Sequence, residues 1–410
     1  MLHGAAGNGN GDVAMPVRAA ERIASLDFIR GIAVMGILAV NIMAFGQPMS
    51  AYMYPGAFLV DPGDPGGWQW IAQLVVFDGK MRGLFALLFG TGMLLFMERA
   101  WERGSTRWLQ AWRLAVLFVF GLLHFYLIWY GDILYLYAVI GCAALLFMKM
   151  EPGGKMRLAL FLYLFGCFFT GGGILLDYIT GGNAFGTYEE IAPAEAALAQ
   201  LKLSGDYPAF IAERFEQQWF LPLIMPLFSF LEIFPLMLMG MALYQMEFFS
   251  GRFDPQAMRR WGWIGVGAGG AATLAVGLYV QSTGFSHAAT SAAIIGWTGL
   301  PRLAMTLGLA ALLVEYSKTA KGWLAHRISA AGRAAFSNYL GTSILMMIVF
   351  HGWGLGLFGA LNRPQLYLVV VITWAIMLAW SKPWLTRFRY GPLEWVWRCL
   401  TYRRLFPIAR

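Results

Sequence analysis

Apolar stretches of about 20 residues recur along the whole chain, and they constrain its fold more than any other feature. Each stretch is long enough to cross a hydrocarbon layer of about 30 Å as an α-helix. The stretches are continuous rather than alternating, which argues against a β-barrel. Only 13% of the 410 residues are charged, whereas soluble domains have about 25%. The sequence therefore predicts an all-α, polytopic membrane protein.

We predict ten membrane-spanning helices, and the positions of Lys and Arg test this topology because cytoplasmic connections are enriched in both. The predicted spans are 26–46, 69–97, 112–130, 132–148, 157–177, 220–246, 261–281, 299–316, 335–352 and 365–381. Both terminal segments and alternate connections hold 23 of the basic residues, whereas the opposite side holds three: Lys202, Arg214 and Arg363. We therefore expect both termini to be cytoplasmic. The net charge of +8 is then an orientation signal and does not indicate nucleic acid.

The chain divides into one large membrane domain with short flanking segments. Residues 1–20 are rich in Gly and Asn, and we expect them to be disordered. Residues 21–402 form a single transmembrane domain, and 403–410 form a basic cytoplasmic end. The largest outer connection, 178–219, contains a helical pattern at 189–203 that we place at the outer surface. The first span contains charged residues and no small-x-small cleavage pattern follows it, so we expect it to remain in the membrane.

Ionisable residues inside the predicted spans are candidate site residues, because an ionised group at that depth costs about 2.5–3.5 kcal/mol. Asp78, Lys80 and Arg82 fall within one span, which is either broken at Gly79 and Gly83 or lines a cavity, and we favour the break. Two interpretations stay open for the three charged residues. They form ion pairs that hold helices in register, or they clamp an anionic substrate.

His124 and Asp132 lie eight residues apart, on either side of a short predicted turn. On one helix their backbones would be about 12 Å apart, so we expect no direct contact, although a substrate or a water could bridge them. His124 is either an interhelical hydrogen-bonding residue or a general base that works near neutral pH. We interpret Asp132 as a cap for the next helix.

Three further polar residues fall within spans or at their ends. Glu232 stands beside Pro235 in mid-span and is a candidate acid or base, although a pairing with Arg82 or Arg302 is the interpretation that we favour. Arg302 and His351 fall near the outer ends of their spans. There they could meet an extracytoplasmic substrate or anchor the helices to the interface.

The motifs of several enzyme classes are missing from the sequence. It contains no GxSxG nucleophile elbow, no P-loop and no HExxH pattern, which argues against hydrolase, ATPase and metalloprotease functions. The three cysteines, Cys142, Cys167 and Cys399, are too widely separated to indicate a disulfide or a metal site. We predict no metal and no tightly bound cofactor.

Several blocks of sequence resemble one bacterial family. These blocks include RIASLDFIRGIAVMGILAVNIMAFG, FDGKMRGLFALLFGTG, GLLHFYLIWYGDILYLYAVIG, GRAAFSNYLGTSI and GPLEWVWRCLTY, and they run in order from residue 22 to residue 402. They resemble the YeiB-like family of bacterial inner-membrane proteins, which is similar in turn to the membrane acyltransferase superfamily. Members of that superfamily carry acyl groups from cytoplasmic acyl-CoA to acceptors on the opposite side of the membrane.

The resemblance implies an acyltransferase with acyl-CoA as co-substrate and a saccharide or lipid acceptor. The superfamily opens with an Arg-x10-His signature, and here Arg30 is followed after ten residues by Asn41. We therefore assign the general base to His124, oriented by Asp78 or Glu232. A polar track would lead from Arg30, which could reach a CoA phosphate, through the remaining candidates: Asn41, Lys80, Arg82, Asp132, Arg302 and His351.

Two other functional classes stay open. The same polar track could serve a transporter or a lipid flippase. A non-catalytic assembly factor would use these residues for stability alone. In each case we expect a multi-pass protein of the bacterial inner membrane that contacts lipids and does not bind nucleic acid, and a homodimer stays open.

Overall fold

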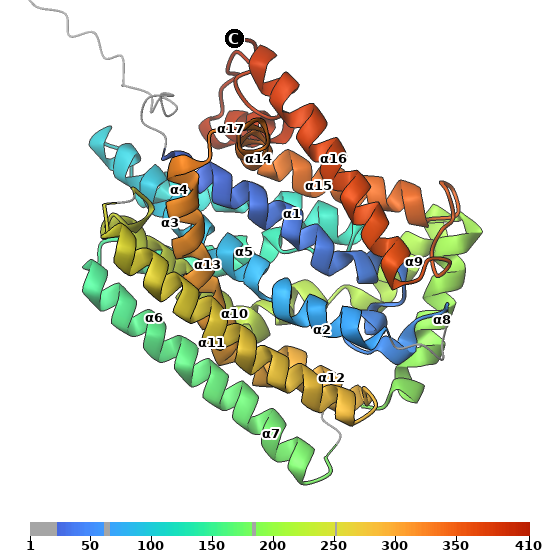
Figure 1. Ribbon diagram of the computed structural model, residues 1–410. Helices are drawn as coiled ribbons and strands as arrows, with labels where there is room; N and C mark the ends of the chain where they lie inside the picture. Colours follow the sequence, from blue (N-terminus) through green and yellow to red (C-terminus); the bar gives the residue numbers. More distant parts are fainter. Residues whose placement is uncertain (1–22, 61–65, 183–185, 251) are drawn as a thin grey trace, which may run out of the picture.

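The computed structural model describes residues 23–60, 66–182, 186–250 and 252–410 (Figure 1). The segment 1–20, which the sequence predicts to be disordered, lies outside these ranges. Within them the chain is helical, and its one strand-like feature is an isolated bridge between Phe388 and Ala409. The predicted all-α fold is confirmed.

Among the described residues, eight helical segments are long and apolar enough to cross a membrane. They are α1 (Ala24–Gly46), α2 with α3 (Gly67–Val76 and Lys80–Glu102), α4 (Arg107–Leu123) with the π turn His124–Ile128, α6 with α7 (Pro152–Gly166 and Gly172–Ile179), α10 (Leu221–Gln245), α11 (Pro255–Ser282), α13 (Gly299–Thr319) and α16 (Arg363–Arg387).

The other two predicted spans take a different form. The span predicted at 335–352 is α15 (Ala335–Phe350), which joins α14 (Trp323–Arg333) at a bend of 86°. The span predicted at 132–148 is α5 (Leu134–Ala144), continued by one 3₁₀ turn to Phe147. This segment is only about 21 Å long at 1.5 Å per residue, so it is too short to cross a hydrocarbon layer alone.

The expected break in the second span lies between α2 and α3. Gly79 has a φ of +71°, a conformation that residues with a side chain rarely adopt. A Cβ at this position would also lie 2.1 Å from Nε of Arg302. The break at Gly79 is therefore confirmed, whereas Gly83 lies inside the continuous helix α3.

The two ends of the bundle differ in what covers them. One end, here called the basic end, gathers the start of α1, the end of α3, the start of α4, the α14–α15 bend and α17 (Pro392–Tyr402) around one cavity. The other, here called the capped end, brings the ends of α1, α4 and α15 beneath α8 (Tyr188–Ser204) and α9 (Tyr207–Gln218). Figure 1 shows α14 and α17 at the top, near the C-terminus, and α8 and α9 at the right edge of the view. Helix α8 confirms the helical pattern predicted at 189–203.

Short elements complete the fold. They are the 3₁₀ turns Met49–Tyr52, Pro55–Ala57 and Phe248–Ser250, the π turns Cys167–Gly171 and Ala293–Trp297, and α12 (His287–Ala292).

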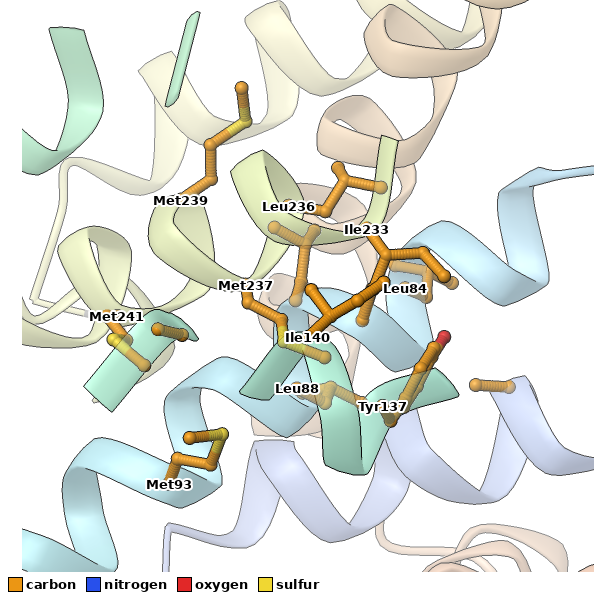
Figure 2. Close-up of a cluster of buried hydrophobic side chains, with 14 of the residues drawn as sticks. Leu84, Leu88, Met93, Tyr137, Ile140, Ile233, Leu236, Met237, Met239 and Met241 are labelled. Atoms are coloured by element: carbon orange, nitrogen blue, oxygen red, sulfur yellow. The ribbon is translucent and has the colours of Figure 1, made fainter. Parts of the chain in front are cut away.

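The core lies where α3, α5 and α10 meet, and Figure 2 shows its packing. Leu84 and Leu88 of α3 face Tyr137 of α5 and Met237 of α10 within one cluster of buried side chains. Helices α3 and α10 approach closely because a glycine faces the partner backbone: a Cβ on Gly90 would lie 2.1 Å from the carbonyl oxygen of Met237. Small residues at such contacts are typical of helix packing in membranes.

Candidate functional site

A cavity of about 290 Å³ opens between the helices at the basic end. Of the residues described, six arginines line it: Arg30, Arg99, Arg103, Arg113, Arg333 and Arg398. The one acidic residue on its wall is Glu394. That carboxylate accepts hydrogen bonds from the backbone N–H groups of Phe336 and Ser337, at 2.7 and 3.1 Å, and so caps α15. The cavity wall is therefore strongly cationic.

The deeper wall of the cavity is apolar. It is formed by Phe85, Leu88, Phe89, Leu117, Leu134 and Tyr339. At the mouth, the Arg113 guanidinium lies between two rings, 4.4 Å from the centre of Phe96 and 4.3 Å from that of Trp397. Such stacking holds a guanidinium in place without neutralising it. A cationic mouth with an apolar interior fits a ligand that has an anionic head and an apolar tail.

His124 and Asp132 form a buried pair beside the deep end of this cavity. Nδ1 of His124 lies 2.6 Å from Oδ2 of Asp132, and both side chains are completely buried. The other carboxylate oxygen, Oδ1, accepts the backbone N–H of Tyr135 at 2.9 Å. Within the described part of the chain, Nε2 of His124 has no hydrogen-bond partner. The pair therefore holds a buried histidine whose second ring nitrogen has no partner among the described residues.

This contact corrects the expectation that His124 and Asp132 do not touch. The helix does not continue to Asp132: it widens into a π turn at His124–Ile128, closed by a hydrogen bond of 2.7 Å from N–H of Trp129 to the carbonyl of His124. The chain then reverses within a few residues, which returns Asp132 to the level of the histidine. Through its bond to Tyr135, Asp132 also holds the first turn of α5, as its capping interpretation requires.

A second, much smaller space lies beyond Tyr339. It measures about 10 Å³, and Asn41, Tyr339 and Trp129 are among its lining residues. Since Tyr339 lines both this space and the arginine cavity, it forms the partition between them. Its ring centre lies 5.2 Å from that of His124, and its hydroxyl accepts the N–H of Ile133 at 3.2 Å. The histidine therefore lies directly beside this partition.

A third space, also about 10 Å³, lies at the capped end and is lined by Lys202, Arg214 and His351. Phe45 and Trp129, whose ring centres are 4.3 Å apart, line both this space and the second one. The three spaces thus form a row from the basic end to the capped end, divided first by Tyr339 and then by the two rings.

The other predicted site residues gather in a separate ion-pair cluster. Arg82 bonds both carboxylate oxygens of Glu232, at 2.9 and 2.8 Å, and Arg302 lies 3.3 Å from the same carboxylate. Arg302 also lies 3.8 Å from Asp78. Lys80 is buried and donates to the carbonyl of Leu74.

The structure also corrects the expectation that Asp78 or Glu232 orients His124. Both carboxylates are held by arginines, and Asp132 occupies the position beside the histidine. Arg82 and Arg302 belong to this cluster and Lys80 bonds a backbone carbonyl, and none of the three lines the row of spaces. Arg30, Asn41 and His351 do border that row.

Sequence reasoning missed several residues of the row. Five of the cavity arginines were used only to predict orientation: Arg99, Arg103, Arg113, Arg333 and Arg398. Lys202 and Arg214 were counted only as basic residues on the outer side. Tyr339 was not singled out. The polar run SNYLGTS within an apolar span was the one available signal for Tyr339. In the described ranges, no group of three or more His, Cys, Asp or Glu side chains could hold a metal ion.

Comparisons with known proteins give relatives along the whole chain. The family described as "Protein of unknown function (DUF418)" matches residues 243–404. The Escherichia coli (strain K12) protein YeiB is 30% identical over 391 residues, which cover 94% of this chain and 98% of that protein. The Bacillus subtilis (strain 168) protein YxaH is 30% identical over 410 residues, covering 96% and 98%. Both carry the description "uncharacterized". No solved structure matches the chain.

Proposed function

The chain belongs to the YeiB-like family, and from this premise we propose that it is an acyltransferase of the bacterial inner membrane. It moves an acyl group from cytoplasmic acyl-CoA to a hydroxyl or amine of a saccharide or lipid acceptor in or across the membrane. The observation that carries the proposal is the row of spaces, which leads from six arginines past the His124–Asp132 pair towards the capped end.

The arginine cavity suits the donor. Guanidinium groups match phosphate oxygens in charge and in geometry, so the cationic mouth takes the phosphates of an acyl-CoA. The apolar wall that ends at Leu134 and Tyr339 takes the acyl end of the donor. This placement brings the thioester towards the histidine, because Tyr339 lies against both the cavity and His124.

The His124–Asp132 pair suits a general base. In the tautomer in which Nδ1–H donates to Asp132, Nε2 carries the free lone pair. Nε2 takes the proton of the acceptor hydroxyl or amine as its oxygen or nitrogen attacks the thioester carbonyl carbon. The carbon–sulfur bond then breaks, and the CoA thiolate leaves and takes the proton back from the histidine. Asp132 stabilises the imidazolium between these two steps.

The experiment compares donor binding and transfer in purified full-length protein in lipid nanodiscs, with acetyl-CoA as probe. Replacing two arginines of the cavity mouth, Arg103→Gln with Arg398→Gln, should weaken acetyl-CoA binding at least tenfold, since each charge-assisted contact contributes about 1.5–3 kcal/mol. Arg259→Gln is the control, because this arginine is exposed and does not line the cavity. Equal binding by all three proteins would contradict the donor site.

The histidine is tested separately. His124→Gln should retain acetyl-CoA binding and lose transfer to added acceptors, whereas His326→Gln, at an exposed position of α14, should keep both. Transfer by His124→Gln at the rate of the natural protein would rule out the general-base role.

A transporter or lipid flippase is the second candidate, and the same row of spaces favours it because such a row also describes a substrate path. Proteoliposomes separate the two functions. Translocation that proceeds without any thioester, by a protein that does not bind acetyl-CoA, would replace the acyltransferase proposal.

A further inference from the structure

The third space, at the capped end, is surrounded by three basic side chains from separate segments. Lys202 comes from α8, Arg214 from α9, and His351 from the turn after α15. Their residues are 7%, 3% and 6% exposed, so the structure withholds all three from bulk solvent.

None of the three forms an ion pair with the described residues. The Lys202 ammonium lies 4.1 Å from the ring centre of Phe358, and no hydrogen-bond acceptor among the described residues reaches it. Arg214 donates to two backbone carbonyls, those of Phe125 and Tyr126, both at 3.2 Å.

Glu195 forms no ion pair with Lys202 among the described residues, and its negative charge offsets the penalty at Lys202 only in part. One carboxylate oxygen of Glu195 accepts the backbone N–H of Ser50 at 2.8 Å, and the other accepts the Ser50 hydroxyl. Among the described residues, the three basic groups therefore lie together with no carboxylate in direct contact.

Such a gathering is unfavourable by itself. Burial, and then the charge of Arg214, lowers the pKa of Lys202 from 10.5 to about 7. Burial, followed by the charges of Lys202 and Arg214, lowers the pKa of His351 from 6.5 to about 3. In both cases burial is the largest cause and the neighbouring cations add to it, so an anion in the space between these groups would favour their cationic forms.

The backbone holds these groups in position. The N–H of Gly352 donates to the carbonyl of Lys202 at 2.8 Å, which fixes the end of α8 against the turn that carries His351. A Cβ at Gly352 would lie 1.9 Å from the carbonyl oxygen of Leu203, so only glycine permits this approach. The space itself is about 10 Å³, close to the minimum that one water requires, and this is room for a single oxygen atom.

We propose that the space between Lys202, Arg214 and His351 is a subsite for one anionic oxygen of the acyl acceptor. The acceptor then carries a phosphate or carboxylate group close to the hydroxyl or amine that receives the acyl group. This assignment rests on the proposed acyltransferase function, because the subsite lies at the far end of the row that begins at the arginine cavity. It shares the lining residues Phe45 and Trp129 with the second space, which Asn41 and Tyr339 also line.

The test measures anion binding without any acyl donor. Full-length protein in nanodiscs of zwitterionic lipid is titrated with sodium phosphate or sodium acetate at constant ionic strength, and the thermal unfolding midpoint is followed. Both anions should raise the midpoint of the natural protein. Lys202→Met should have a higher midpoint without anion, since it removes an uncompensated buried charge, and it should lose the anion-dependent rise.

Two variants serve as controls. Lys202→Arg should keep most of the anion response because it retains the charge. Lys321→Met, which changes an exposed lysine in the connection before α14, should respond as the natural protein does. An unchanged response in Lys202→Met, or no response in the natural protein, would overturn the subsite.

A second arm distinguishes the sources of the anion. The midpoint is measured again in nanodiscs containing phosphatidylglycerol. A Lys202-dependent rise without added salt assigns the anion to a lipid headgroup, whereas a rise only with added phosphate or acetate assigns it to a soluble acceptor. Either result supports the subsite.

The outcome also separates this inference from the proposed function. Anion binding through Lys202 without any acetyl-CoA affinity would keep the subsite and reject the acyltransferase. Acetyl-CoA binding and transfer without any Lys202-dependent anion response would keep the acyltransferase and reject the subsite.

Discussion

The His124–Asp132 pair is completely buried, so neither side chain can exchange its partner for water. A buried polar group that loses its partner costs about 1–3 kcal/mol, and this penalty holds the imidazole in one orientation. The orientation leaves Nε2 without a partner among the described residues and next to the Tyr339 partition. At the scale of single residues, this is the feature with the clearest chemical consequence.

Asp132→Asn should therefore impair transfer more than stability. Asparagine retains an oxygen that can accept the N–H of Tyr135, but it cannot stabilise an imidazolium. We expect the transfer rate to fall by about 10,000-fold, the loss that follows when the aspartate of a Ser-His-Asp triad is replaced by asparagine. Acyl transfer at saturating acetyl-CoA measures the effect, with donor binding as the control. A rate within threefold of the natural protein would exclude the role of Asp132.

His351 should make the protein less stable as the pH falls. Its folded pKa, about 3, lies below its unfolded value of 6.5 because of burial and of the charges of Lys202 and Arg214. The unfolded state therefore binds more protons between these values, and stability is lost as the pH falls from 6.5 towards 3, by at most about 1.4 kcal/mol per pH unit. The neutral variant His351→Gln should lose less stability over this range. Parallel pH profiles for the two proteins, followed by thermal unfolding, would contradict the assignment.

Charged residues in apolar spans were recognisable from the sequence, but their partners were not. Glu232 pairs with Arg82, 150 positions away, and with Arg302, and no local pattern encodes such contacts. Asp132 was visible only as a residue at a turn. Its contact with His124 depends on a π turn that widens the helix by one residue, and no periodicity in the sequence marks that point.

Among the helices, α3 both packs against α10 and lines the arginine cavity, through two glycines within one turn. On one side, Gly90 lets α3 approach α10, and on the other Gly92 lines the arginine cavity. A Cβ at Gly92 would meet nothing within 4 Å. Two glycines that look alike in the sequence therefore serve packing and ligand space respectively.

Substitutions at these two glycines should have opposite consequences. Gly90→Ala should destabilise the protein by about 1–3 kcal/mol, because its Cβ must displace the backbone of Met237. Gly92→Leu should leave stability nearly unchanged and weaken acetyl-CoA binding at least tenfold by filling the cavity, whereas Gly92→Ala should have a smaller effect. Thermal unfolding and donor titration of the three variants measure this. Full acetyl-CoA affinity in Gly92→Leu would mean that the donor does not enter the cavity.

At the scale of the whole molecule, the arginines that predict orientation are also the lining of the cavity. Arg99 and Arg103 lie at the end of α3 and Arg113 lies in the first half of α4, whereas Arg333 and Arg398 come from far along the chain. Basic residues favour the cytoplasmic side, and acyl-CoA is expected on that same side. The proposed function and the predicted topology therefore both require that the basic end faces the cytoplasm.

Labelling of single cysteines tests whether the basic end faces the cytoplasm. In a variant without Cys142, Cys167 and Cys399, new cysteines replace Ser204 at the capped end or Thr319 at the basic end, both of which are exposed. A membrane-impermeant maleimide, applied to the side of the membrane opposite the cytoplasm, should label position 204 and leave position 319 unlabelled until the membrane is opened. Immediate labelling at position 319 would invert the topology and remove the cytoplasmic donor from the proposed function.

Local patterns in the sequence were enough to predict the class of protein and the approximate positions of the long apolar helices, because both follow from the length of the apolar runs and from the glycine at a break. Tertiary structure alone decided which polar residues meet. It placed Asp78 and Glu232 with arginines, Asp132 with His124, and Lys202 with His351. Such meetings depend on how helices distant in the sequence pack and on where one helix widens and turns back, and neither is a property of any single stretch of residues.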